Sequence, residues 1–378
     1  MKTLYIHIGT PKTGSSAIQS FLCQNREVLT QKGFCYPEFP FRYDYVSKRR
    51  NGYFLHAEGL GNKGSGFEEG MDIIRASFEK YPNVILSDEG IWYENSKWHK
   101  KLFKIMKERG YQVKLVVYLR RQDEFLISKW NQILKTASYK YKDKFDGLEN
   151  AEDMWKTFLQ KSLKDSTMHY GEHLKKLEDI YGRENILVRR YDRKYFPEDS
   201  ICADFLQTVG LKLTEEYKAA QIMVNPSLSQ NTAEIQRILN TVLTESEEDD
   251  MEDDSNMQFF RKILLSYSEL SKKAYPCSMF SEEEAKEFME RYSEGNRKIA
   301  KEYFGEEELF SPVDHTKLKW EKNSPNMQDD IIRFMGITCI HFLEENRKIR
   351  RELQELKLFK SKVRHPIHAL GQKLSNKE

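Results

Sequence analysis

The chain has 378 residues, and its hydrophobic fraction of 39% is enough for a large buried core. A formal net charge of +2 gives no reason to expect nucleic acid or another polyanion as a partner. The five cysteines form no C-x-x-C pair, which argues against a disulfide framework or a zinc site. No signal peptide and no apolar run of the ~20 residues that span a bilayer are visible, so we expect a cytoplasmic, bacterial protein.

The first segment predicts a phosphate-binding loop between a strand and a helix. The apolar run Thr3–Ile8 is typical of a buried strand, and the pattern of Ser16–Lys32 is typical of an amphipathic helix. The turn between them combines a lysine, a glycine and hydroxyl side chains: Lys12, Thr13, Gly14, Ser15 and Ser16. Backbone N–H groups in such a turn, together with the helix dipole, favour an anion. The loop differs from a Walker A motif because Lys12 precedes Gly14.

The following segments alternate between strand and helix patterns. Strands are predicted at Val84–Ser87, Val113–Leu119 and Ile186–Arg190, and helices at Glu68–Tyr81, Ser96–Arg109 and Asp123–Thr136. This alternation predicts an α/β fold, a P-loop-like, three-layer parallel sheet flanked by helices. Ligands of such sheets bind at the carboxyl ends of the strands. Lys12 and Arg120 both stand at predicted strand ends, so we expect them at one nucleotide site.

Arg120 also begins a spaced pair, because Ser128 follows it by eight residues on the predicted helix. The loop PKTGSS and this pair resemble the PAPS-dependent sulfotransferases, in particular their bacterial and glycan-type branch, over about the first 310 residues. The resemblance implies that PAPS is the co-substrate and that no metal is required. It places the 5′-phosphosulfate on the loop, the 3′-phosphate on Arg120 and Ser128, and the adenosine beside Tyr191. Lys12 is implied as the catalytic group at the leaving oxygen.

Two residues are candidates for the general base that deprotonates the acceptor. Glu89 follows the strand predicted at Val84–Ser87 and is the first choice. His56 is the second choice, because it lies in the earlier region where glycan-type sulfotransferases often carry a glutamate base. The alternatives are a carboxylate at a helix N-terminus for Glu89, and a packing or acceptor-binding role for His56.

The order K-T-G-S-S, without the late glycine-rich basic loop of the animal cytosolic enzymes, implies a carbohydrate acceptor. A hydroxyl of a surface polysaccharide, its precursor or a glycolipid would receive the sulfuryl group. Two alternatives stay open. One is a P-loop-like kinase that uses ATP and magnesium, with Asp88 as a Walker B mimic, although the position of Lys12 disfavours it. The other is a non-catalytic, nucleotide-binding coiled-coil scaffold.

The chain is predicted to contain a sulfotransferase domain over residues 1–315 and a C-terminal helical tail over 316–378. The domain would consist of an α/β core over about 1–215 and a helical part over about 216–315. Helical additions and one long terminal helix therefore complete the predicted fold.

Two local signals lie in the helical part. Ser281 and Glu284 predict a capping box that starts a helix through about Phe304. The acidic run 246–254 predicts a solvated surface turn.

The tail carries a heptad pattern. Apolar residues and one asparagine recur in alternating steps of three and four: Ile332, Met335, Cys339, Phe342, Asn346, Ile349, Leu353 and Leu356. Asn346 takes an a position, which favours a parallel homodimer with a fixed register. The alternative, weighed equally, is a long helix packed on the body of its own chain. The basic end predicts a disordered tail, with a weak contact to a membrane surface as the alternative.

Overall fold

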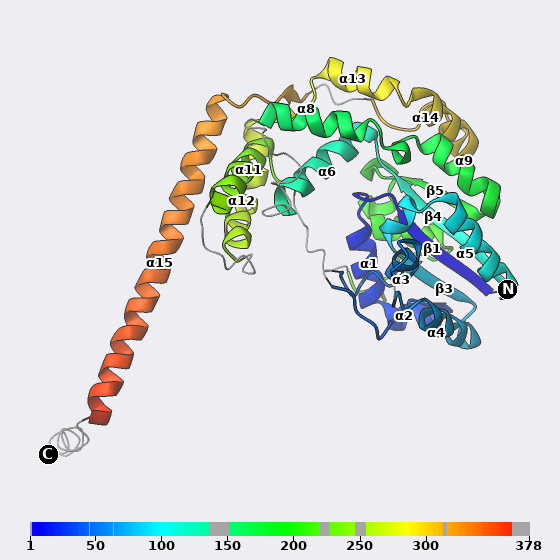
Figure 1. The fold of residues 1–378 in the computed structure, drawn as a ribbon, viewed down its shortest axis with the longest axis horizontal. Helices are drawn as coiled ribbons and strands as arrows, with labels where there is room; N and C mark the ends of the chain where they lie inside the picture. Colours follow the sequence, from blue (N-terminus) through cyan, green and yellow to red (C-terminus); the bar gives the residue numbers. More distant parts are fainter. Residues whose placement is uncertain are drawn as a thin grey trace. The chain divides into compact units, whose positions relative to one another are not determined.

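The structure is a computed structural model that describes residues 2–44, 46–62, 64–136, 151–219, 227–245, 255–312 and 316–364 (Figure 1). Its main sheet has five strands in the order β2-β3-β1-β4-β5, and all neighbouring strands are parallel. The strands are β1 (Lys2–Gly9), β2 (Phe34–Cys35), β3 (Asn83–Ser87), β4 (Tyr111–Leu119) and β5 (Ile186–Arg190). The four predicted strands are confirmed, and the short β2 is an addition that the sequence did not reveal.

The strands could be predicted from the sequence because helices cover both faces of the sheet, so each strand is a nearly continuous apolar run. Every residue of β1 after Lys2 is buried, as expected for a central strand of a parallel sheet. The register pairs His7 of β1 with Ser87 of β3 and with Val116 of β4. The carboxyl ends of β1, β3, β4 and β5 therefore meet at one edge of the sheet. That edge is where a parallel sheet binds its ligands.

Helices cover the two faces in separate layers. One face packs residues such as Ile6 and Leu115 against α3 (Tyr53–Gly59), α4 (Phe67–Lys80), α5 (Ser96–Glu108) and α9 (Tyr170–Tyr181). The other face packs residues such as Tyr5 and Val116 against α1 (Ser15–Gln24), α2 (Arg26–Gln31) and α10 (Ile201–Thr208). The predicted three-layer α/β class is confirmed.

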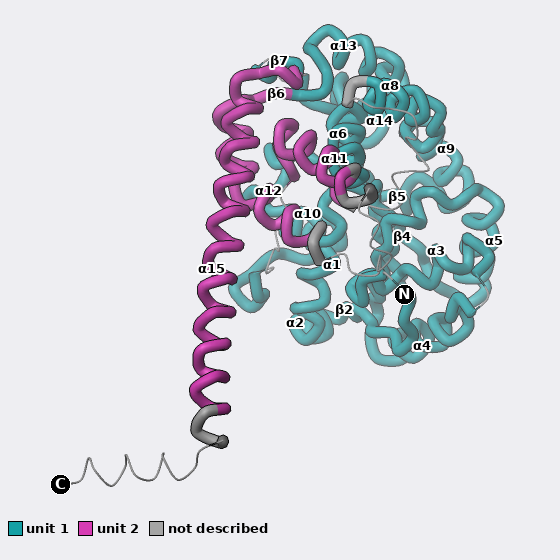
Figure 2. The backbone as a smooth tube through the Cα atoms, turned by 60° about the vertical axis from the view of Figure 1, so that its left-hand side comes forward, with its two compact units in different colours: residues 1–133, 147–226, 278–319 teal, residues 134–146, 227–277, 320–378 magenta. Residues whose placement is uncertain are grey.

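The chain divides into two units (Figure 2). The first unit comprises residues 1–133, 147–226 and 278–319 and contains the main sheet. The second unit comprises residues 134–146, 227–277 and 320–378. The helices α11 (Gln230–Glu245), α12 (Ser255–Ala274) and α15 (Pro325–Arg364) belong to this second unit. The predicted division into a domain over residues 1–315 and a helical tail over 316–378 stays a prediction.

The long terminal helix is confirmed as α15. The other helices named below are α6 (Gln122–Thr136), α8 (Ala151–Ser162), α13 (Glu282–Glu290) and α14 (Ser293–Ile299). None of the described helices is both long and apolar enough to cross a membrane. The acidic run 246–254 and most of the basic end, 365–378, lie outside the described residues.

Two helices that were predicted as continuous, over Ser16–Lys32 and from Ser281 to about Phe304, are each interrupted in the structure. The helix expected over Ser16–Lys32 is interrupted at Asn25, whose amide donates to the carbonyl oxygens of Phe21, at 2.9 Å, and of Lys218, at 3.0 Å. The capping box of Ser281 is confirmed. The helix that it starts ends at Glu290, however, and the chain continues as α14 and a π-helical turn that stops at Gly305, which has φ 67°.

Candidate active site

The loop between β1 and α1 is fixed to the carboxyl end of β4. The backbone N–H of Thr10 donates to the Tyr118 carbonyl oxygen at 2.8 Å, and its hydroxyl donates to the same oxygen at 3.1 Å. The buried hydroxyl of Thr13 donates to the Thr10 carbonyl oxygen. Lys12 and Gly14 have positive φ values of 66° and 75°. Left-handed residues within a tight turn direct successive N–H groups to one side, which creates an anion-binding concavity.

Gly14 has a left-handed backbone and little space for a side chain. A Cβ at this position would lie 2.7 Å from Cδ1 of Ile201 and 3.1 Å from Cε2 of Tyr191. The ring of Tyr191, which follows β5, therefore lies directly against the loop. Tyr191 is the residue predicted to sit beside the adenosine, and the structure places it next to the predicted phosphate loop.

We expect Gly14→Ala to lower the free energy of unfolding by about 1 to 2 kcal/mol, because left-handed strain is joined by the shift that Ile201 and Tyr191 must make. The matched control is Gly110→Ala. Gly110 has φ +73° and nothing within 4 Å of an added Cβ, so only the strain applies and about 1 kcal/mol is expected. Urea unfolding of the two variants measures the difference. Equal losses would show that the close approach at Gly14 is not restrictive.

The start of α1 offers an unused donor. Ser15 is buried, and its hydroxyl has no hydrogen-bond partner among the described residues. A buried polar group without a partner costs free energy, so its retention at a helix N-terminus is consistent with a ligand that accepts from it. The Ser16 side chain is exposed at the next position. An anion seated on this helix end would satisfy the Ser15 hydroxyl.

Arg120 joins the loop to the second predicted motif. Its Nη1 donates to the Lys12 carbonyl oxygen at 3.0 Å across 108 residues of sequence. Its guanidinium also lies 5.3 Å from the centre of the Tyr191 ring. Lys12, Arg120 and Tyr191, which were predicted to share one nucleotide site, are therefore neighbours at the carboxyl edge of the sheet.

Ser128 lies on the same face of α6 as the residue that pairs with Arg120. Arg120 Nε is 3.4 Å from Glu124 Oε2, and Ser128 is one helical turn beyond Glu124. The Ser128 side chain is half-buried. Glu124 therefore contacts Arg120, and Ser128 lies on the side of α6 that faces in the same direction as Glu124.

Lys12 sits among opposing charges. Burial lowers the pKa of Lys12, the positive charge of Arg120 lowers it further, and the negative charge of Glu89 raises it. Glu89 is close to the loop from another direction, because a Cβ at Gly9 would lie 3.0 Å from Glu89 Cβ. The strand end of β3 thus brings a carboxylate beside the lysine, as its position in the sequence predicted.

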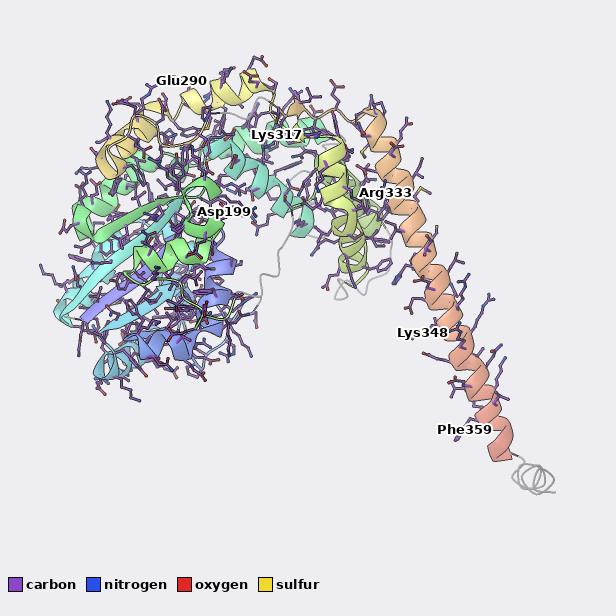
Figure 3. All side chains as sticks on the ribbon, turned by 180° about the vertical axis from the view of Figure 1, so that it is seen from behind. Asp199, Glu290, Lys317, Arg333, Lys348 and Phe359 are labelled. Atoms are coloured by element: carbon purple, nitrogen blue, oxygen red, sulfur yellow. The ribbon has the colours of Figure 1, made fainter. Side chains whose placement is uncertain are left out.

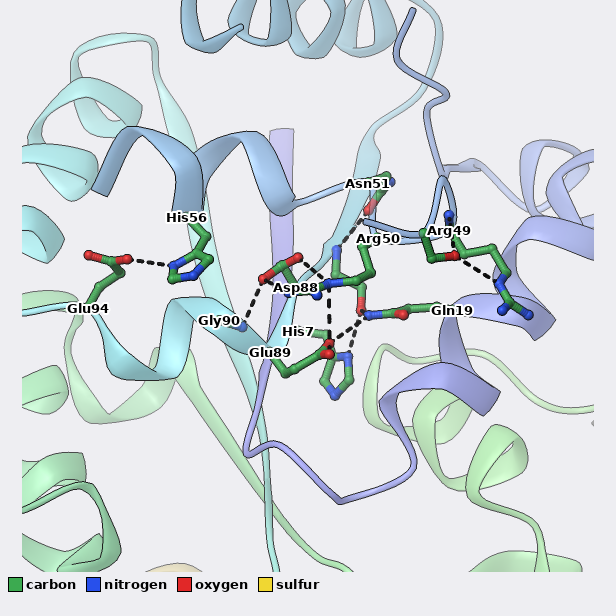
Figure 4. A network of polar contacts seen from close by, with 12 residues as sticks. His7, Gln19, Arg49, Arg50, Asn51, His56, Asp88, Glu89, Gly90 and Glu94 are labelled. Carbon is green, nitrogen blue, oxygen red and sulfur yellow. Dashed lines mark hydrogen bonds and ion pairs between the residues drawn. The ribbon is translucent and has the colours of Figure 1, made fainter. Parts of the chain in front are cut away.

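The two carboxylates that follow β3 have different surroundings (Figure 4). Asp88 is fully buried and accepts two hydrogen bonds from Arg50, at 2.8 and 2.9 Å, and one from the Gly90 N–H at 2.8 Å. Burial raises the pKa of Asp88, and the contacts with Arg50 and Gly90 oppose that shift. Because Arg50 engages both of its oxygens, Asp88 is poorly placed to hold a magnesium ion, which counts against its use as a Walker B mimic.

Glu89 is held more loosely than Asp88. Its Oε2 accepts from Gln19 Nε2 at 3.0 Å, and its Oε1 lies 3.8 Å from Arg50 Nε. The Gln19 amide also contacts the Ser87 hydroxyl at 3.3 Å, which in turn lies 2.8 Å from His7 Nδ1. Burial lowers the pKa of His7 to about 4, so its ring is neutral and structural. Gln19 thereby orients the carboxylate that was chosen as the base.

His56 forms a separate pair with Glu94. His56 Nδ1 lies 2.7 Å from Glu94 Oε1, and both side chains are mostly buried. The ring packs against the backbone after Glu89, because a Cβ at Gly90 would lie 2.5 Å from His56 Cδ2. Figure 4 shows Glu94 on the side of His56 that faces away from Glu89. The contact with Glu94 involves Nδ1, the ring nitrogen on the side away from Glu89.

The partners Gln19, Arg50 and Glu94 were missed by the sequence analysis. They come from a helix, a loop and the segment after β3, and Glu94 is 38 residues from His56. No local spacing marks such pairs, because tertiary contact alone brings them together. Among the described residues, no group of three or more His, Cys, Asp or Glu side chains is arranged to hold a metal ion. The expectation that catalysis needs no metal stays a prediction.

No protein-family model matches the chain. An uncharacterized protein of Archaeoglobus fulgidus is 31% identical over 201 residues, which are 52% of this chain and 47% of that protein. The chain thus spans about half the length of this curated relative.

Two solved structures share a partial likeness with the fold. A sulfotransferase from Alicyclobacillus acidocaldarius matches with 13% identity and a TM-score of 0.35, over 56% of this chain and 82% of that chain. A sulfotransferase domain from the curacin biosynthetic pathway matches with 10% identity and a TM-score of 0.30, over 57% and 76%.

Proposed function

We propose that this protein is a sulfotransferase that transfers the sulfuryl group of PAPS to a hydroxyl of a carbohydrate. The observation that carries the proposal is the 3.0 Å hydrogen bond from Arg120 to the Lys12 carbonyl oxygen. It joins an anion-binding loop to a second cationic group at the same edge of the sheet. A nucleotide with a 5′-phosphosulfate and a separate 3′-phosphate needs two neighbouring anion sites of this kind.

The loop would bind the phosphosulfate end of the nucleotide. Lys12 supplies charge, and the unpartnered Ser15 hydroxyl and the N–H groups at the start of α1 supply donors. Arg120 would bind the 3′-phosphate, with Ser128 one turn beyond its present partner Glu124. The ring of Tyr191, against the loop and under the Arg120 guanidinium, would pack on the adenosine.

The reaction is an in-line displacement at sulfur. The acceptor oxygen forms a new bond to sulfur while the bond from sulfur to the bridging phosphate oxygen breaks, and the base takes the hydroxyl proton. Lys12 is the group that would stabilise the negative charge on the leaving oxygen. Glu89, oriented by Gln19 at 3.0 Å, is the first choice for the base, and His56 with Glu94 behind it is the second.

The acceptor class rests on the resemblance to glycan-type enzymes. The acceptor would be a surface polysaccharide, its precursor or a glycolipid, and the protein would act in the cytoplasm. The kinase alternative is weakened by Asp88, whose two oxygens are engaged by Arg50. The scaffold alternative predicts binding of the nucleotide without turnover, so acceptor screens with PAPS separate it from an enzyme.

The first test is titration calorimetry with PAP, the 3′,5′-bisphosphate product, against 5′-AMP and ATP, first in the presence of EDTA and then with magnesium chloride in its place. We expect PAP to bind most tightly, and Arg120→Ala to weaken PAP by about 10- to 100-fold, because charge-assisted hydrogen bonds to the 3′-phosphate are lost. Binding of 5′-AMP, which lacks that phosphate, should change much less.

The control for this test is Arg75→Ala. Arg75 is an exposed residue of α4 that pairs with Asp72 at 3.0 Å, so its loss should leave PAP binding unchanged. A preference for ATP, or binding that appears only with magnesium, would reject the sulfotransferase proposal and support the kinase.

A further inference from the structure

The helix α15 carries an exposed apolar seam, defined as its a and d positions from Ile332 to Leu356. Its large apolar members are exposed by about half or more: Ile332 68%, Met335 58%, Phe342 52%, Ile349 57%, Leu353 49% and Leu356 57%. Cys339 is also exposed. Figure 3 shows the side chains of this helix, with Arg333, Lys348 and Phe359 labelled along it. A seam of this length whose large apolar side chains stay about half exposed is unusual for a surface helix.

A different face of α15 packs within its own unit. Asp330 accepts from Asn231 at 2.9 Å, and its carbonyl oxygen accepts from the Tyr267 hydroxyl at 3.2 Å. Phe334 is buried, with its ring 5.9 Å from that of Phe260. In the heptad frame, Asp330 and Phe334 occupy f and c positions, which lie opposite the seam. Packing on its own chain therefore covers the c and f face. On the seam, the ring of Phe342 lies 5.6 Å from that of Phe259 of α12, yet Phe342 is still 52% exposed. Most of the seam is therefore left to another partner.

The charges beside the seam identify that partner. The g positions Glu345 and Glu352 are acidic, and the e positions Arg350 and Lys357 are basic, and all four are exposed. In a parallel pair, each g residue faces the e residue that lies five positions further along the other helix. Glu345 would then face Arg350 of the second copy, and Glu352 would face Lys357. An antiparallel pair would instead place glutamate against glutamate and cation against cation.

We propose that α15 binds a second copy of this chain as a parallel, in-register coiled-coil dimer along the seam. Asn346 supports this register, because an asparagine at an a position pairs with its counterpart in a parallel dimer and specifies that state. Isoleucine at the d position 349 and leucine at the a position 353 would by themselves favour trimers or tetramers. The dimer therefore depends on Asn346 and on the flanking charges. The inference does not depend on the proposed enzymatic function.

The experiment is sedimentation equilibrium of the full chain. The wild type is expected to be a dimer. The variant Glu345→Lys with Glu352→Lys, and the variant Arg350→Glu with Lys357→Glu, should each raise the dimer dissociation constant by about tenfold or more, because every pair across the seam becomes repulsive. These residues are exposed, so circular dichroism should show an unchanged fold.

Combining the complementary charge variants should restore dimerisation, which separates a loss of pairing from a loss of folding. An equimolar mixture of the two charge variants should form a mixed dimer, and the chain with all four substitutions should dimerise again. A wild type that is monomeric, trimeric or tetrameric would overturn the proposal. A dimer whose dissociation constant does not respond to these charges would overturn it as well.

Orientation is tested by the native thiol at an a position. In a parallel, in-register dimer, Cys339 faces Cys339 of the second copy, within the range of a disulfide. Mild oxidation with diamide removes two protons and two electrons from the thiols and should link the dimer covalently. Cys339→Ser should abolish the link, whereas Cys277→Ser, at a half-buried cysteine, should not. A dimer that does not cross-link through Cys339 would reject the parallel register.

Discussion

Replacing Lys12 by alanine is expected to lower kcat by about 100- to 1000-fold in the proposed reaction, the usual cost of losing one group that stabilises charge in a transition state. The bridging oxygen gains negative charge as its bond to sulfur breaks, so kcat should fall more than the affinity for PAP. Steady-state kinetics and calorimetry measure the two separately. Lys104→Ala, at a largely exposed lysine of α5, is the control and should leave both unchanged.

Lys12→Arg should restore little of this rate. The guanidinium is planar and carries its charge over several nitrogens, whereas the ammonium is a compact charge that can follow the leaving oxygen. A kcat for Lys12→Ala within a few-fold of the wild type would contradict the proposed role of this residue.

The pH dependence of the same step follows from the neighbours of Lys12. Burial and Arg120 lower the pKa of Lys12, and Glu89 raises it. Since the charged lysine is the active form in the proposed reaction, kcat/KM should fall as the pH rises through that lowered pKa. Removing the positive charge in Arg120→Ala should move the alkaline limb to higher pH, and removing the negative charge in Glu89→Gln should move it to lower pH. A limb that stays in place in both variants would mean that it reports another group.

Much of the sheet could be predicted because each strand is buried on both faces. Ile186–Arg190 was predicted with the same bounds that β5 has, and the run of Val113–Leu119 lies wholly within β4. Periodicity is a local property, so it carries this information. The break at Asn25 could not be predicted, because it depends on a contact with Lys218, which lies 193 residues away.

For the candidate site, too, local features could be predicted from the sequence and tertiary contacts could not. The sequence placed Lys12, Arg120 and Glu89 at strand ends, and the rule for parallel sheets then placed them at one edge. Their partners depend on packing that no spacing encodes. Arg50 reaches Asp88 from a loop before α3, and Gln19 reaches Glu89 from α1. The heptads of α15 predicted the seam, but only the contacts of Asp330 and Phe334 show which face of the helix packs most deeply on its own chain.

The second large expected effect is the loss of kcat when the proposed general base, Glu89, is replaced. Glu89→Gln keeps the shape of the side chain and an oxygen for Gln19, but it cannot accept the acceptor's proton, so we expect kcat to fall by about 100- to 10,000-fold. Affinity for PAP should change little. The loss of activity at low pH that a carboxylate base causes should also disappear. Initial rates with PAPS and the best acceptor, over a range of pH, provide the measurement.

His56→Asn and Glu94→Gln complete the comparison, because Glu94 contacts His56 at 2.7 Å and faces away from Glu89. If Glu89 is the base, these two variants should lower kcat less than tenfold, with any larger effect on the KM of the acceptor. If His56 is the base, His56→Asn should show the large loss instead. Glu94→Gln should then follow it, since a carboxylate behind an imidazole orients the ring and stabilises its charged form. The kcat values of these variants therefore show whether Glu89 or His56 takes the acceptor's proton. Glu94→Gln can affect that step only through His56, whereas Glu89→Gln affects it directly.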